Sequence, residues 1–157
     1  MNGKEIIKKL IDHGWTVLRM NTRYPALITD DPDGGFHVQF VDLDEAFTEG
    51  DTLEEALFNA AEVLTLTLEG RLSEDMEVPP PSTGVKKAHY IAPDAKTQGV
   101  LLLRAARGER SLADLARALD TSWPQAKRLE DPHHWPSLKT LDRAARVLGK
   151  RLVLSFE

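Results

Sequence analysis

The sequence predicts an α+β protein: a small sheet-and-helix domain, followed by an all-α domain that ends in a short strand. In the front part, alternating apolar residues flank a glycine-rich turn, as in a half-buried hairpin. In the back part, apolar residues recur at helical spacing. Residues 1–85 hold 6 Lys/Arg against 17 Asp/Glu, a net charge of −11. Residues 86–157 hold 14 Lys/Arg against 8 Asp/Glu, a net charge of +6. The two parts therefore suit partners of opposite charge.

Composition narrows the function classes. The chain of 157 residues has no cysteine, which excludes a disulfide scaffold, a thiol nucleophile and thiolate metal sites. The lack of cysteine fits a reducing compartment, and we expect a cytoplasmic location. No run of about 18 apolar residues is present, so we expect no membrane span, and the polar N-terminus predicts no secretion signal.

The front elements follow from local signals. Residues 4–18 predict a helix that ends at Gly14 and then a short strand, a fragment too small to bury a core alone. Residues 24–29 and 36–40 predict two strands joined by the turn at 31–35. Residues 46–48 form a possible third strand.

A helix should follow, with Asp51 or Thr52 as N-cap and two glutamates in its first turn. We expect it to cover one face of the sheet. Its predicted apolar stripe consists of Leu53, Ala56, Leu57, Ala60, Ala61, Leu64 and Leu68.

Residues 78–84 resist both helix and strand and predict an extended connector, placed where the charge changes sign. A possible strand at 88–92 follows, and Asp94 then leads into a helix at 95–107. The expected organisation is an N-terminal fragment at 1–19, the sheet-and-helix domain at 20–77, a linker with a possible strand at 78–94, and the all-α domain at 95–157.

The back part contains two short helices with a tight turn between them. Ser111 caps a helix that runs to Leu119, and Asp120 and Thr121 make the turn. Ser122 caps a second helix, residues 123–129. A third helix at 137–148 should point Leu138, Leu141, Ala144, Ala145 and Leu148 inward. From Lys96 to about Leu148 the pattern resembles the helix-turn-helix of Cro and C1-type repressors.

A helix-turn-helix places its second helix in the major groove, which predicts the DNA contacts. By position, Trp123, Pro124 and Arg128 would face bases, and Arg128 could reach a guanine for about 1–3 kcal/mol of discrimination. The remaining predicted DNA-binding residues, nearer phosphates or at a helix cap, are Ser111, Ser122, Gln125 and Lys127. The alternative interpretation is a three-helix bundle with a solvated basic face.

A single helix-turn-helix binds DNA weakly, so we expect at least a homodimer. The apolar tail at 150–156 could pair as a strand with its copy in a second subunit, or equally with a strand of its own chain.

Other chemistry finds little support. The acids of the front part lie in predicted turns and strand ends, and no spacing among them fixes a metal site. His133 and His134 are adjacent on a loop, an arrangement that rarely ligates one ion. The sequence shows no glycine-rich phosphate loop and no serine nucleophile motif. We therefore predict no metal, no cofactor, no catalytic residue and no enzymatic activity.

Three stretches, Arg23–Ile28, Asp33–Leu43 and Ala46–Ala56, together resemble a HicB antitoxin, and the resemblance extends over residues 20–157. It implies a partial ribonuclease H-like fold for the front domain, without nuclease activity. It also implies binding and neutralisation of a HicA toxin, a small basic mRNA-cleaving ribonuclease, and repression of the protein's own operon by binding double-stranded operator DNA. Family members usually form dimers or higher oligomers.

Residues 1–10 and 14–19 instead resemble the opening helix and strand of a HicA toxin. In that family a Gly-Ser-His-His-type stretch with the catalytic histidine comes next, whereas residues 20–24 here read Met-Asn-Thr-Arg-Tyr. We interpret this segment as a toxin remnant, natural or engineered, without ribonuclease activity. The alternative function is a repressor only, whose front domain senses a ligand or dimerises.

Overall fold

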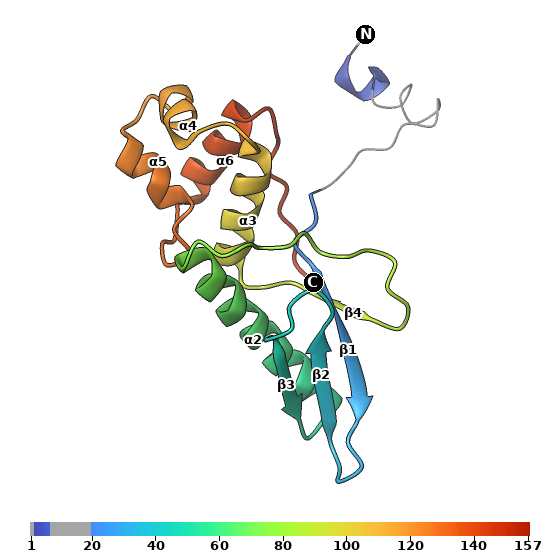
Figure 1. Cartoon of the computed structure of the whole chain (residues 1–157). Coiled ribbons are helices and arrows are strands. Elements are labelled where there is room, and N and C mark those ends of the chain that lie inside the picture. The colour runs from blue at the N-terminus through green and yellow to red at the C-terminus, as the bar shows by residue number, and fades with distance from the viewer. Residues whose placement is uncertain (1, 7–19) are drawn as a thin grey trace.

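The computed structural model describes residues 2–6 and 20–157. Within them the chain is a mixed α+β protein with a four-stranded antiparallel sheet (Figure 1). The helix and strand expected within residues 4–18 fall mostly outside the described residues. The elements are β1 (Tyr24–Asp30), β2 (Phe36–Phe40), β3 (Phe47–Gly50), α2 (Leu53–Ser73), β4 (His89–Ile91), α3 (Ala95–Arg107), α4 (Leu112–Ala118), α5 (Trp123–Leu129) and α6 (Leu138–Val147).

The sheet has the order β3-β2-β1-β4, and the predicted hairpin forms its centre. Thr29 lies opposite His37 and Leu27 opposite Gln39, with the turn made by Gly34 and Gly35 at positive φ. The possible third strand is confirmed as β3, which pairs with β2. The possible strand near residue 90 is confirmed as β4 on the free edge of β1.

Helix α2 covers one face of this sheet (Figure 1). Thr52 is the N-cap, and its hydroxyl accepts a hydrogen bond from the backbone N–H of Glu55. The buried residues recur every four positions and are Ala56, Ala60, Leu64, Leu68 and Leu72. Leu53 was expected in this stripe, but its side chain is exposed. It lies one position off the buried row, in the first turn of α2, where no other element of the described residues covers it.

The connector before β4 lies against the sheet. The Tyr24 hydroxyl donates to the carbonyl oxygen of Pro79 at 2.7 Å, and the Ser82 N–H donates to Asp42 Oδ2 at 2.8 Å. Burial raises the pKa of Tyr24 to about 12, which keeps this phenol neutral as a donor. Because β4 belongs to the sheet, the chain crosses to the back helices only at residues 92–94. We call β1–β4 with α2 the front unit, and α3–α6 the back helices.

The back helices enclose a second core. Ser111 and Ser122 cap α4 and α5 as predicted, and Ser137, expected as the first residue of the third helix, caps α6. Each hydroxyl accepts a hydrogen bond from the N–H three residues on. Asp120 turns the chain between α4 and α5 with a φ of 52°. Leu138, expected inward, is 63% exposed because it lies in the first turn of α6, beyond the core. The core residues are Leu103, Leu115, Ala116, Leu119, Ala126, Leu129, Ala144 and Leu148.

Polar contacts hold the front unit against the back helices. The Asp94 N–H donates to Thr65 Oγ1 at 2.9 Å, so the crossing segment is attached to α2. Lys96 Nζ lies 2.7 Å from Glu69 Oε1, and both side chains are largely buried. Ser73 Oγ lies 3.0 Å from His133 Nε2 on the loop after α5. The helix that covers the sheet therefore also contacts the loop that follows α5.

The C-terminal tail differs from its prediction. Within the described part of the chain, residues 150–157 join no strand, so the in-chain pairing is wrong. The tail runs back toward the start of β1, where Glu157 forms an ion pair with Arg23 (Figure 1). Val153, Leu154 and Phe156 are exposed along it. An apolar strand is stable only with a hydrogen-bonding neighbour, and the tail has none in this monomer. Pairing with a second copy stays a prediction.

Candidate DNA-facing and partner-facing surfaces

Helix α5 presents the predicted DNA-binding residues to solvent. Ala126 and Leu129 point into the core, and this fixes the rotation of the helix. All the positions named from the sequence are exposed: Ser111, Ser122, Trp123, Pro124, Gln125, Lys127 and Arg128. Six of them lie on α5 or its cap, and Ser111 lies at the start of α4, where its hydroxyl is used in a capping box with Asp114.

The exposed side chains of α5 divide into two groups. Lys127 Nζ lies 5.2 Å from the centroid of the Trp123 ring, a cation–π contact one helical turn apart. Gln125 and Arg128 instead line a hollow shared with α6. The sequence assigned Trp123 to bases and Lys127 to phosphates, whereas the structure places these two side chains against each other. They would therefore meet any ligand as one surface.

A buried ion pair fixes the far end of α5. Glu130, the C-cap, accepts hydrogen bonds from Arg107 of α3 at 2.7 Å and 2.9 Å in a bidentate arrangement. The side chain of Glu130 is 8% exposed. The carboxylate raises the pKa of Arg107, so the pair stays charged. This ion pair thus connects the C-terminal end of α5 directly to α3.

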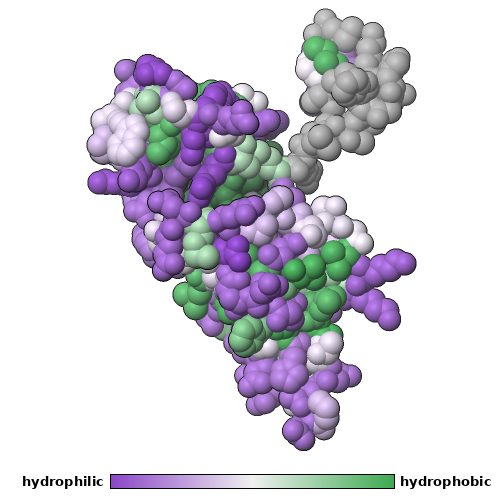
Figure 2. Space-filling view, in the orientation of Figure 1, coloured by the Kyte–Doolittle hydropathy of each residue, from purple (hydrophilic) through white to green (hydrophobic). Residues whose placement is uncertain are grey.

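The second candidate surface is the sheet face that α2 leaves uncovered. We define the open sheet face by the outward residues of the three leading strands: Leu27, His37, Gln39, Phe47 and Glu49. The Phe47 side chain is 64% exposed and that of Leu27 is 40% exposed. In the view of Figure 2, hydrophobic surface gathers over the sheet, between a polar hairpin tip and the polar surface of the back helices.

Gln39 makes this face rigid. Its Nε2 lies within 3.0–3.3 Å of four carbonyl oxygens, one at the end of β2 and three in the segment that joins β2 to β3, so this segment is held in place. Phe47 begins the strand directly after this segment and lies opposite Gln39. An exposed aromatic side chain on a rigid backbone is typical of a protein-binding surface.

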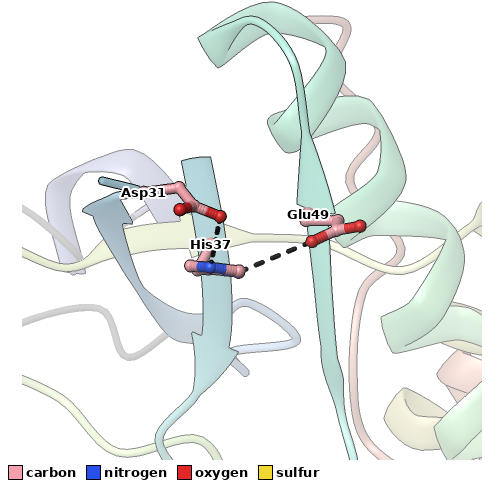
Figure 3. Close-up of side chains that lie close together, drawn as sticks. All are labelled: Asp31, His37 and Glu49. Carbon is pink, nitrogen blue, oxygen red and sulfur yellow. Dashed lines mark ion pairs between the residues drawn. The ribbon is translucent and has the colours of Figure 1, made fainter. Parts of the chain in front are cut away.

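A charged cluster borders the same face. His37 lies between two carboxylates, with Nε2 2.8 Å from Asp31 Oδ2 and Nδ1 3.7 Å from Glu49 Oε2 (Figure 3). The ligand atoms of the three residues lie within 4.8 Å of one another. The two ring nitrogens address different carboxylates, but one ion can take only one of them. The geometry is that of an ion-pair network and gives no argument for a metal ion.

The sequence alone assigned no binding role to the residues of the open sheet face. The necessary signal was present, because the alternation in Phe36–Phe40 already places His37 and Gln39 on the outward side. Phe47 and Glu49 could be added only with the register between β2 and β3, which local pattern does not give.

Among the described residues, no helix is long and apolar enough to cross a membrane.

Comparisons with known proteins agree on one family. A family model described as the HicB_like antitoxin of bacterial toxin-antitoxin system matches residues 23–93. Antitoxin HicB of Escherichia coli is 34% identical over 134 residues, which span 84% of this chain and 97% of that protein. Antitoxin HicB 2 of Photorhabdus laumondii is 36% identical over 135 residues, spanning 85% and 96%. The match therefore includes both the front unit and the back helices, and the chain belongs to the HicB antitoxin family.

Proposed function

We propose that the protein neutralises a HicA-type mRNA-cleaving toxin with its front unit and represses its own operon by binding DNA with its back helices. The observation that carries this proposal is the joining, in one chain, of an acidic unit with an open sheet face to a basic set of helices that exposes α5. In this proposal the front unit has the partial ribonuclease H-like fold, α4 and α5 form a helix-turn-helix, and the protein acts in the cytoplasm.

Charge supports a basic protein as the partner of the front unit. Residues 20–85 contain 2 Lys/Arg against 15 Asp/Glu, a net charge of −13. Both arginines are occupied within the chain, since Arg23 pairs with Glu157 and Arg71 with Glu45. The uncompensated carboxylates favour fast, salt-sensitive association with a basic protein, and the exposed apolar residues supply area to bury.

The open sheet face is the proposed toxin contact. We expect the double substitution Phe47→Ala with Glu49→Lys to weaken toxin binding at least tenfold, because it removes an aromatic anchor and reverses a charge. Binding is measured by calorimetry with a purified HicA-type toxin, and neutralisation by the loss of ribonuclease activity on mixing.

The matched control is Phe58→Ala with Glu62→Lys on the outer side of α2, where Phe58 is also exposed. It makes the same chemical change on another surface and should leave toxin binding intact. If the α2 variant weakened toxin binding more than the sheet variant did, the toxin contact would be assigned to α2 instead. A toxin that stays fully active with the wild-type protein would contradict the antitoxin function itself and favour a repressor only.

The tail is the proposed dimer contact. We expect Val153→Asp with Phe156→Asp to halve the mass seen by light scattering, from twice the chain mass of 17.5 kDa to a single chain. Binding to a duplex from upstream of the gene should weaken in parallel, because a single helix-turn-helix binds poorly. Leu66→Asp, which charges an exposed leucine of α2, is the control and should stay dimeric. A wild-type protein that is monomeric would refute the tail contact.

A further inference from the structure

A basic hollow lies between α5 and α6, beside the exposed surface of α5. Its volume is about 340 Å³. Arg128 of α5 forms one side, and Lys139 and Arg143 of α6 form the other, with His134 on the loop between these helices. Three hydroxyl groups, of Thr121, Ser137 and Thr140, line it as well. Its lining, all of it within the described residues, includes no aspartate or glutamate.

The cations of this hollow are not taken up by ion pairs within the described part of the chain. Among the described residues, neither Arg128 nor Lys139 forms an ion pair, whereas other cations of the back helices do. Arg143 donates to the carbonyl oxygen of Leu119 at 2.6 Å, which fixes its guanidinium at the wall. Two unpaired cations and one anchored cation facing a common space attract an anion that can accept several hydrogen bonds.

We propose that this hollow holds a backbone phosphate of a DNA duplex whose major groove receives α5, so that the DNA contacts extend onto α6. The inference rests on the DNA-binding part of the proposed function and deepens it. Phosphates flank the major groove on both sides of a recognition helix, and contacts to them position a protein without reading sequence. The N-terminus of α6 opens beside Ser137, which adds the positive end of a helix dipole.

The lining of the hollow distinguishes the expected role of Arg128 on α5 from that of Lys139 on α6. Arg128 also lines a second hollow, together with Lys127 and Pro124 of α5, so it lies between the two hollows on the exposed side of the helix. Lys139 and Arg143 belong only to the hollow on the α6 side. Lys139 should therefore act on affinity alone, while Arg128 should also affect the choice of sequence.

The test compares Lys139→Gln with the wild type on two duplexes of equal length, one from upstream of the gene and one scrambled, across a salt titration. Losing one phosphate contact makes the negative slope of log K against log salt shallower by about 0.9, equivalent to about fivefold weaker binding near 0.15 M salt. Both duplexes should lose the same factor. Lys139→Arg should restore the slope, and Arg128→Ala should lower the ratio of specific to scrambled binding.

The matched control is Arg146→Gln, which removes one charge from the same helix. Arg146 pairs with Asp142 at 2.8 Å and does not line the hollow, so its salt slope should stay at the wild-type value. Equal slope changes in both variants would reduce the effect to net charge and overturn the phosphate site. An unchanged slope in Lys139→Gln would overturn it too, while wild-type binding to the upstream duplex still upheld the proposed function.

Competition by small anions tests whether the hollow binds a free anion instead of a DNA phosphate. Inorganic phosphate should compete with the duplex no better than chloride at matched ionic strength, since a free ion lacks the neighbouring contacts of a duplex. Phosphate binding that depends on Lys139, together with an unchanged duplex slope, would assign the hollow to a free anion and overturn the proposal. If the wild type binds neither duplex, the DNA-binding function and this inference fail together.

Discussion

The substitution Gly50→Ala is expected to destabilise the front unit by about 3 kcal/mol or more, an overpacking effect at the upper end of its usual range. Gly50 ends β3 directly against the first turn of α2. A Cβ there would lie 2.4 Å from the backbone N and 2.7 Å from the Cα of Ala56. Backbone atoms cannot move aside as a side chain can, so β3 and α2 would have to separate. Urea unfolding followed by circular dichroism measures the loss.

The control for this substitution is Gly70→Ala in α2. Among the described residues, no atom outside the adjoining backbone of α2 lies within 4 Å of the added methyl group. Alanine is also favoured over glycine in a helix, so we expect a gain of about 0.5–1 kcal/mol. The functional readout is toxin binding, which Gly50→Ala should abolish at temperatures where the altered unit is unfolded. A Gly50→Ala protein as stable as the wild type would show that β3 does not pack on α2 in this way.

The substitution Glu130→Ala is expected to lower the free energy of unfolding by about 3 kcal/mol and to weaken DNA binding. Removing one member of a buried ion pair leaves the other charge without a partner, which costs more than the pair contributed. Arg107 would be left between α3 and the end of α5, and its 19% exposed side chain would need water to enter. Because this pair connects the end of α5 to α3, DNA affinity should fall even where the protein stays folded.

Two variants isolate the cause. Glu130→Gln keeps the shape and one acceptor oxygen for Arg107, so its stability should lie between wild type and Glu130→Ala. Asp142→Ala breaks an exposed ion pair with Arg146 and should cost at most about 0.5 kcal/mol. A Glu130→Ala protein that unfolds like Asp142→Ala would mean that the Arg107 contact carries no structural role.

Local sequence signals were sufficient for most elements of this fold. The serine caps of α4 and α5, the glycine turn and the alternating strand each depend on neighbours within a few residues, and all of them were confirmed. The two apolar residues placed wrongly, Leu53 and Leu138, both lie in the first turn of a helix. Periodicity identifies the side of a helix that faces the core, but it does not show how many turns of that side are covered by neighbouring elements.

Contacts between distant segments could not be predicted in this way. The pairing of Glu130 with Arg107 joins residues on different helices, and the bond between Lys96 and Glu69 joins the back helices to α2. Nothing in the local pattern distinguishes these acids from solvated ones. The basic hollow was missed for the same reason, because Lys139 and Arg128 meet only once α6 has packed beside α5.

The short crossing at residues 92–94 bears on how the two proposed activities combine. It is attached to α2 through Asp94 and Thr65, and the adjoining Lys96 is held by Glu69. These contacts therefore restrict rotation of the front unit relative to the back helices. A toxin molecule carried on the sheet would be delivered to a set position along the operator, shielding base pairs that the antitoxin itself never touches. The footprint on the promoter would then report directly on how much toxin is bound.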